Sequence, residues 1–309
     1  MKVIIPFLCS LLLTLSACQD TANSQTPSES IQMEAVSEVT PLPSYDIHCT
    51  AQNAALCQSH LEGLQLAKLG DLPIHQIAIE VGKRFMGTPY VAKTLEIEGE
   101  ERLVVDMQGL DCTTFLENVV VMARLTQQDR LSLDQFHAEL GTIRYRDGEL
   151  EGYSSRLHYF TEWIHNNQEK GIIRDISQQI GGLVYDKPID FMSTHRDAYA
   201  QLSDDGLYQA IQKAEGQLNQ TYPRYFIPKD QVQAVESRIQ DGDLIAITTS
   251  IKGLDVVHTG FALHQKGRLH LFHASSGSKE VEISQKPLAE YLAGIKHQSG
   301  IMVCRLTDG

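Results

Sequence analysis

The chain has 309 residues, of which 42% are hydrophobic, and a formal net charge of −13. The negative charge and the lack of a Lys/Arg cluster argue against nucleic-acid binding, which needs basic patches to neutralise phosphates. Beyond residue 46 the chain is long enough for one large domain or two small ones. No second Pro/Ser-rich linker interrupts this part, so we expect a single, monomeric domain over residues 47–309 with an insertion at about residues 130–240.

Residues 1–18 have the pattern of an export signal. A short basic start precedes an apolar stretch that is well below the roughly 20 residues needed to span a membrane. The sequence LSAC at residues 15–18 has the form of a bacterial lipobox, so we expect Cys18 to carry lipid; an ordinary cleaved signal is the alternative. Gln19 after the cysteine favours outer-membrane sorting, which predicts a lipid anchor on the periplasmic face of the outer membrane.

Residues 19–46 are polar, rich in Ser, Thr, Pro and Glu, and show no apolar periodicity. Such a composition buries too little apolar surface to offset chain entropy. We therefore expect a flexible tether between the membrane anchor and the domain.

Four cysteines follow the tether. Cys49 and Cys57 either form a disulfide in an oxidising compartment or stay free. Cys304 lies in an expected terminal strand, where a buried cysteine acts as a small hydrophobe. Cys112 is then the odd thiol and a candidate reactive residue.

Apolar residues at helical spacing predict helices in the first two thirds of the chain. The helix over residues 112–126 has Asp111 as its N-cap and apolar residues on most of its circumference, so we expect it to be central and buried. The other predicted helices cover residues 74–86, 133–140, 157–167, 207–218 and 230–239.

In the last quarter of the chain the apolar period changes to two, which predicts strands. They cover residues 243–249, 255–263, 268–274 and 301–306, with a short helix around residues 288–292. Helices first and an antiparallel sheet last indicate the α+β class, with a central helix packed on the sheet.

Cys112 at a helix start, with histidines on distant strands, has the arrangement that makes a thiol nucleophilic. The helix dipole and a neighbouring imidazolium both favour the thiolate, so we expect a pKa one to several units below the free value of about 8.5. The candidate histidines are His258 in DVVHTGFAL and His273 in LHLFHASSG. A cysteine or histidine of this kind is by itself more often structural, but the three together indicate a catalytic site.

The hairpin that carries the two histidines predicts that they meet. A turn at residues 264–267, with a loop of two or four residues, places His258 directly opposite His273, with Cβ atoms about 4.5–5.5 Å apart. A three-residue loop would place them on opposite faces of the sheet. With the first turn, His273 can orient and polarise His258, as the third member of a triad does.

Five motifs occur in the order found in the papain-like NlpC superfamily of peptidoglycan cysteine hydrolases, which the chain resembles over residues 75–306. They are GTPYV (87–91), DCTTF (111–115), DGDLIAI (241–247), VVHTGFAL (256–263) and LFHASS (271–276). The resemblance implies a papain-like core, Cys112 as nucleophile, His258 as base and acid, and His273 as orienting residue. It implies neither cofactor nor metal. Tyr90, Asp111 and Thr113 match positions that line the family's substrate cleft.

The chain departs from minimal members by a step of 146 residues between Cys112 and His258 and by Asp241 in place of a proline. These features resemble the N-acetylmuramoyl-L-alanine amidase branch. The insertion's aromatic and histidine residues are then expected to contact the glycan, although helix core is an equal interpretation. They include His158, Tyr159, Trp163, His195 and Tyr199.

The amidase branch predicts cleavage of the amide between N-acetylmuramic acid and L-Ala in peptidoglycan or muropeptides. Three alternatives remain: a γ-D-glutamyl-diaminopimelate endopeptidase of the same fold, a zinc amidase, and a non-enzymatic wall-binding lipoprotein. The zinc alternative is weak because His270 and His273 point to opposite strand faces and no H-E-x-x-H motif occurs.

Overall fold

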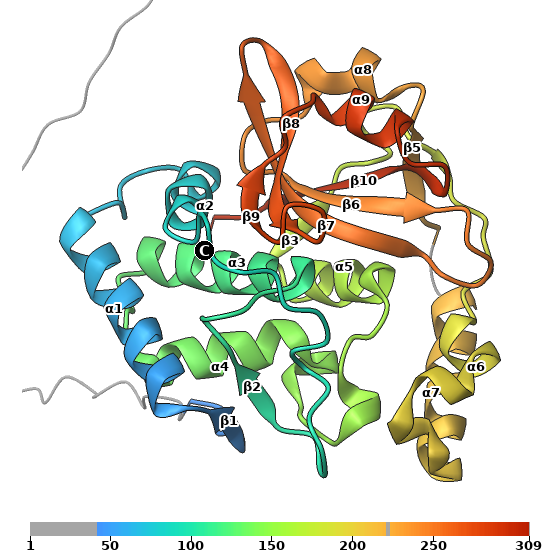
Figure 1. Ribbon diagram of the computed structural model, residues 1–309, viewed down its shortest axis with the longest axis horizontal. Helices are drawn as coiled ribbons and strands as arrows, with labels where there is room; N and C mark the ends of the chain where they lie inside the picture. The colour runs from blue at the N-terminus through green and yellow to red at the C-terminus, as the bar shows by residue number, and fades with distance from the viewer. Residues whose placement is uncertain (1–41, 221–222, 309) are drawn as a thin grey trace, which may run out of the picture. The chain divides into compact units, whose positions relative to one another are not determined.

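The computed structural model describes residues 42–220 and 223–308 (Figure 1). The predicted signal peptide, Cys18 and most of the predicted tether lie outside these residues. Within the predicted tether, the Tyr45 hydroxyl donates to the Gly148 carbonyl at 2.7 Å, and its ring stacks on that of Tyr145. The packed domain therefore begins before residue 47. None of the helices in the described ranges is long and apolar enough to cross a membrane.

An antiparallel sheet forms one layer of the fold, and in the described residues it has eight strands (Figure 1). Their order is β4-β5-β10-β6-β7-β8-β9, and β3 also pairs with β10. A separate parallel pair joins β1 and β2. The bounds are β1 Ile47–Cys49, β2 Leu103–Val105, β3 Ile173–Asp175, β4 Leu183–Val184, β5 Tyr225–Pro228, β6 Leu244–Thr249, β7 Val256–Gln265, β8 Arg268–Ser275, β9 Glu280–Ile283 and β10 Gln298–Leu306.

Helix α3 is the central helix, as predicted, and it packs against β7 and β8 with α2 and α4 beside it (Figure 1). Its apolar residues are buried on all sides, and Phe115 contacts the rings of Phe261 and Phe272 from the sheet. The α+β class is therefore as predicted. The helices are α1 Ala51–Ala67, α2 Ile74–Lys83, α3 Cys112–Gln127, α4 Leu133–Arg144, α5 Phe160–Glu169, α6 Phe191–Thr194, α7 Asp205–Gln220, α8 Val232–Val235 and α9 Leu288–Ala293.

The insertion is mainly helical, as predicted, but it is built into the domain. Its short strands β3, β4 and β5 join the main sheet, and Phe136 of α4 and Trp163 of α5 lie in the main core. Helices α6 and α7 surround a separate apolar cluster that includes Met192 and Ile211. The insertion therefore contributes to the core as well as to the surface.

Several elements were not predicted: α1, β9 and the short strands β1 to β5. Helix α1 buries Cys57, Leu61 and Leu64 on one side, and Thr50 caps it. Cys49, Cys57, Cys112 and Cys304 are all free thiols in the structure. Cys304 is 1% exposed in β10, which fits its predicted role as a small hydrophobe.

Candidate active site

Cys112 is the first residue of α3, and the capping of this helix fixes its position. The Asp111 carboxylate accepts hydrogen bonds from the backbone N–H groups of Thr113 and Thr114, at 3.1 and 2.8 Å. In return, the Thr114 hydroxyl accepts from the Asp111 N–H at 2.9 Å. This is a capping box, which holds the first turn in place. The Cys112 N–H is not engaged by the cap and points out of the helix start, like other first-turn amides.

Strand β7 meets Cys112 at Thr259. The Thr259 hydroxyl donates to the Cys112 carbonyl at 2.9 Å. Thr259 and Thr113 also lie near the Cys112 sulfur, where their polar groups lower the pKa of the thiol in part. The sulfur therefore lies beside the residue that directly follows His258 in the chain.

The thiol and the predicted base are both neutral at rest. Burial raises the pKa of Cys112 to about 11, and the Asp111 carboxylate adds to the rise, against the hydrogen bonds from Thr259. Burial lowers the pKa of His258 to about 4. The predicted lowering of the thiol pKa is therefore wrong, because enclosure penalises the thiolate and a neutral imidazole supplies no positive charge.

His258 and His273 form a direct hydrogen bond. The distance from His258 Nε2 to His273 Nδ1 is 2.5 Å, and the rings are perpendicular, at 88°, with centroids 4.7 Å apart. His273 is fully buried, and burial followed by the nearby His258 lowers its pKa to about 3. The two histidines lie together on one face of the hairpin, as predicted.

The predicted register of this hairpin is wrong by two residues. The turn is Lys266-Gly267, whose φ values of 51° and 78° are those of a two-residue type I′ turn. His258 is consequently diagonal to His273 and not directly opposite it. Because side chains alternate along a strand, a shift of two residues preserves the face, and the contact survives.

Gly260 allows the two strands to approach at this point. A Cβ atom on Gly260 would lie 2.6 Å from the Phe272 carbonyl oxygen and 2.9 Å from the Cβ of His273. Glycine therefore provides the room in which His273 reaches the ring of His258.

The backbone of Tyr90 is held between two segments next to the site. Its N–H donates to the Lys279 carbonyl at 2.8 Å, and the N–H of Val91 donates to the carbonyl of Leu110, just before the N-cap of α3. Burial raises the pKa of Tyr90, and the nearby Cys112 and Asp111 raise it further. Tyr90 thus lies beside Cys112, where a cleft residue was expected.

A cavity of about 240 Å³ lies next to the start of α3. Asp111 and Thr113 line it from the helix, and Arg156 and His158 line it from the insertion. The half-buried His158 donates a hydrogen bond from Nε2 to the Tyr153 carbonyl at 2.7 Å. Burial and the neighbouring Arg156 hold its pKa well below the ordinary value, so it is neutral. Of the predicted substrate contacts in the insertion, His158 is the one that faces this cavity.

A second cavity, of about 510 Å³, shares Lys93 and Glu96 with the first and extends to Tyr199. Arg156 forms ion pairs with Glu96 at 2.5 Å and Glu101 at 3.3 Å. The positive charge of Arg156 in the cavity wall is therefore balanced by two carboxylates. The two cavities meet at these shared residues and together form a groove beside the start of α3, lined by both polar and apolar side chains.

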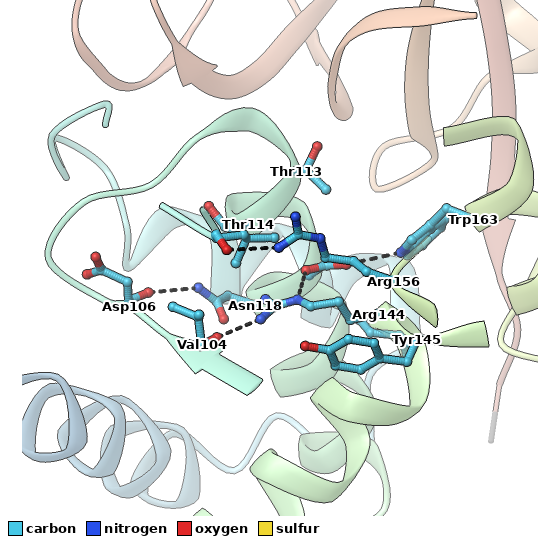
Figure 2. A network of polar contacts seen from close by, with 12 residues as sticks. Val104, Asp106, Thr113, Thr114, Asn118, Arg144, Tyr145, Arg156 and Trp163 are labelled. Carbon is cyan, nitrogen blue, oxygen red and sulfur yellow. Dashed lines mark hydrogen bonds and ion pairs between the residues drawn. The ribbon is translucent and has the colours of Figure 1, made fainter. Parts of the chain in front are cut away.

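A buried polar network lies behind the start of α3 (Figure 2). Glu117 of α3 accepts hydrogen bonds from Arg144 Nε at 2.7 Å and from Trp163 Nε1 at 3.2 Å. Arg144 also donates to the Val104 carbonyl at 2.6 Å. The side chains of Glu117 and Arg144 are only 2% and 3% exposed. The network joins α3 to α4, α5 and β2.

Three residues that were predicted to contact the substrate lie at positions that do not suit this role. Trp163 is 1% exposed and stacked on Phe160, and Tyr159 is 4% exposed with its hydroxyl bonded to Glu215 at 2.7 Å. Both belong to the core. His195 is exposed directly after α6, where it stacks on Phe191 of that helix, and it is not among the residues that line either cavity.

Thr259 and the Glu117–Arg144 pair were not predicted, although the sequence holds signals for both. Thr259 alternates with His258 on β7, so its side chain faces the side of the sheet that α3 covers. Glu117 is an acidic residue inside an apolar helix, which indicates a buried partner. Across the described ranges, no group of three or more His, Cys, Asp or Glu side chains is arranged to hold a metal ion.

Comparison with known proteins places the chain among amidase-like peptidoglycan hydrolases. A family model described as AmiA-like, N-acetylmuramoyl-L-alanine amidase-like, matches residues 80–301, and the chain belongs to this family. A search among curated proteins gave no match.

Several solved structures share this fold. An N-acetylmuramoyl-L-alanine amidase from Bacteroides uniformis is 35% identical, with a TM-score of 0.72 over 76% of this chain and 99% of that one. A protein from Bacteroides fragilis, provisionally named a xylanase, is 37% identical, with a TM-score of 0.69 over 73% and 98% of the two chains. A protein from Legionella pneumophila shares the fold at 21% identity, with a TM-score of 0.61 over 82% and 94%.

Proposed function

We propose that this protein cleaves the amide between N-acetylmuramic acid and L-Ala by thiol acyl transfer within a papain-like core. Two observations support the proposal: Cys112 lies at a capped helix start, where the Thr259 hydroxyl donates to its carbonyl, and His258, the residue before Thr259 on β7, forms a hydrogen-bonded pair with His273. The bond follows from membership of the amidase-like family and from the name of the B. uniformis neighbour.

In the proposed reaction, His258 takes the proton of Cys112 as the sulfur attacks the lactyl carbonyl of muramic acid. The neutral resting pair suits this order, because charges form only when substrate is bound. The Cys112 N–H at the helix start donates to the oxyanion. The C–N bond then breaks, His258 protonates the amine of L-Ala, and water hydrolyses the thioester with His258 as base.

The groove beside Asp111 and Thr113 is the proposed site for the sugar. Its walls carry hydrogen-bonding groups, and its Arg156 is paired with Glu96 and Glu101. Such a surface suits a neutral, hydroxyl-rich ligand better than a strongly charged one. His158 and Tyr199 provide aromatic faces along the groove.

Lipidation of Cys18 is proposed to anchor the enzyme on the periplasmic face of the outer membrane, with peptidoglycan within reach of the domain. The lipobox LSAC at residues 15–18 supports this location. Metabolic labelling with a fatty acid, with a Cys18→Ala variant as control, tests the anchor. Label retained by Cys18→Ala would refute it.

To identify the bond that is cleaved, the enzyme is incubated with an N-acetylmuramoyl peptide and with the same peptide without the sugar. The products are then identified by mass spectrometry. We expect release of a peptide with an L-Ala amino terminus from the first substrate and no cut in the second. Remote binding energy positions the reacting carbonyl, so loss of the sugar lowers kcat as well as affinity. Cleavage of the free peptide after D-Glu would instead identify an endopeptidase.

The nucleophile is tested with Cys112→Ala, and Cys304→Ala serves as a matched control because it removes a buried thiol in β10. Cys112→Ala is expected to abolish hydrolysis with the fold intact. Cys304→Ala is expected to lose some stability and to keep its activity per folded molecule. An active Cys112→Ala enzyme would refute the mechanism, and an inactive wild type would favour a wall-binding protein.

A further inference from the structure

We propose that Glu282 is a positioning residue that completes a chain His258–His273–Glu282 and fixes the tautomer of the base. The inference rests on the proposed function, since it concerns how the same site holds its base. It adds a carboxylate from β9, a strand that the sequence did not predict.

The first observation is an unpartnered nitrogen. His273 is 0% exposed, and among the described residues no group forms a hydrogen bond with its Nε2 atom. Buried ring nitrogens normally have a partner, because an unpaired polar atom away from water is costly. The nearest oppositely charged group is the Glu282 carboxylate, whose Oε1 lies 3.9 Å from this nitrogen.

The second observation is that the sheet itself creates this pairing. In the β8–β9 register His273 is directly opposite Glu282. Side chains at opposed positions lie on the same face, at the distance where cross-strand pairs interact. A carboxylate at position 282 is therefore directed to His273 by the backbone. Its side chain is 25% exposed, so the carboxylate is in contact with solvent as well as with the histidine side of the strand.

The hydrogen-bond directions follow from these contacts. For His258 to accept the thiol proton on Nδ1, its Nε2 must carry hydrogen and donate to His273 Nδ1. His273 must then carry its own hydrogen on Nε2, which points to Glu282. One acceptor at the end of the chain thus selects the tautomer of both histidines. When His258 becomes an imidazolium, the same carboxylate stabilises the positive charge through His273.

The distance of 3.9 Å is longer than a hydrogen bond, and the proposal includes its closure by a small rotation of the Glu282 side chain as His258 gains charge. Among the described residues, Tyr291 of α9 is a further titratable group next to His273, with ring centroids 5.7 Å apart. Burial raises the pKa of Tyr291, and Glu282 and Cys112 raise it further, so it stays protonated. The negative charge available to His273 therefore comes from Glu282.

The test compares Glu282→Gln, Glu282→Asp and the matched control Glu280→Gln in pH profiles of kcat and kcat/KM on an N-acetylmuramoyl peptide. Glu280 is exposed on the same strand. For Glu282→Gln we expect kcat to fall roughly 10-fold. The acidic side of the profile of kcat/KM against pH (its acid limb) should move to lower pH by about one unit. The reason is that Glu282→Gln removes the negative charge that favours protonation of His258. Glu282→Asp should restore the position of the limb, and Glu280→Gln should match the wild type.

A purely structural role would lower the rate without moving the limb. An unshifted acid limb in a folded Glu282→Gln enzyme, or a Glu282→Asp enzyme with the same profile as Glu282→Gln, would overturn the inference. These outcomes leave the proposed function intact if the wild type cleaves and Cys112→Ala does not. Full activity of Cys112→Ala would refute the proposed function first.

Discussion

Replacing Glu117 by Gln isolates the charge of a buried ion pair, because glutamine keeps the volume and an oxygen that can accept from Trp163. Glu117 and Arg144 are 2% and 3% exposed, so Arg144 would keep a buried charge with the Val104 carbonyl but without its carboxylate. Removing one partner of such a pair costs about 3–5 kcal/mol. For a domain of this size, 3 kcal/mol corresponds to a Tm lower by roughly 6–12 °C.

The matched control is Glu139→Gln, since Arg124 and Glu139 form a second ion pair between α3 and α4, at 2.5 Å. Those side chains are 13% and 16% exposed, and solvent access should hold the loss to about 1 kcal/mol or less. Denaturant unfolding monitored by circular dichroism measures both changes. Equal losses for the two variants would refute the argument from burial. The double change Glu117→Leu with Arg144→Met should recover much of the loss.

Three further predictions concern the site. Because the pKa of Cys112 is raised to about 11, its alkylation by iodoacetamide should accelerate steadily from pH 7 to pH 10; a plateau below pH 7 would instead indicate a resting ion pair. The folded pKa values of His258 and His273, about 4 and about 3, lie below the unfolded value of about 6.5, so stability present above pH 6.5 should be lost as pH falls through 4. His273→Gln should flatten that loss in urea titrations, and an unchanged slope would count against burial of the neutral ring. Gly260→Ala should lower kcat while the protein still folds, because the added Cβ would push against His273. Activity assays on folded protein test this prediction, and a kcat equal to that of the wild type would disprove it.

The contact between the two histidines could be predicted from the sequence because it depends only on which face of the hairpin each side chain occupies. Side chains alternate between the faces, so an even shift in the pairing leaves both histidines on the same face. A turn centred one residue too early shifts the strand pairing by two residues, which still assigns His258 and His273 to the same face. The choice between a turn at residues 264–267 and one at Lys266-Gly267 depends on which residues adopt positive φ. Gly267 fits that requirement readily, but the positive φ of Lys266 is not indicated by its residue type.

Burial and charge at the site could not be predicted in the same way. Tyr159 and Trp163 are residue types found both in cleft walls and in cores, and only tertiary packing decides: Trp163 lies in the main core and Tyr159 in the apolar cluster around α6 and α7. The sign of the Cys112 pKa shift depends on desolvation, which competes with the helix dipole and has no local sequence signal. Glu282 was missed because β9 is only four residues long and carries two acidic residues.

The insertion connects the two elements that carry the proposed catalytic residues. Helix α5 begins where the backbone and hydroxyl of Thr161 both donate to the buried Asp255 carboxylate, each at 2.8 Å. Asp255 precedes His258 by three residues, so this contact holds the start of the strand that carries the proposed base. Two residues further along α5, Trp163 donates to Glu117 on the helix that begins with the proposed nucleophile, Cys112. A single helix of the insertion therefore contacts both the segment before His258 and the helix that starts at Cys112. If the proposed mechanism holds, the long segment between Cys112 and His258 supplies a helix that fixes these two elements relative to each other.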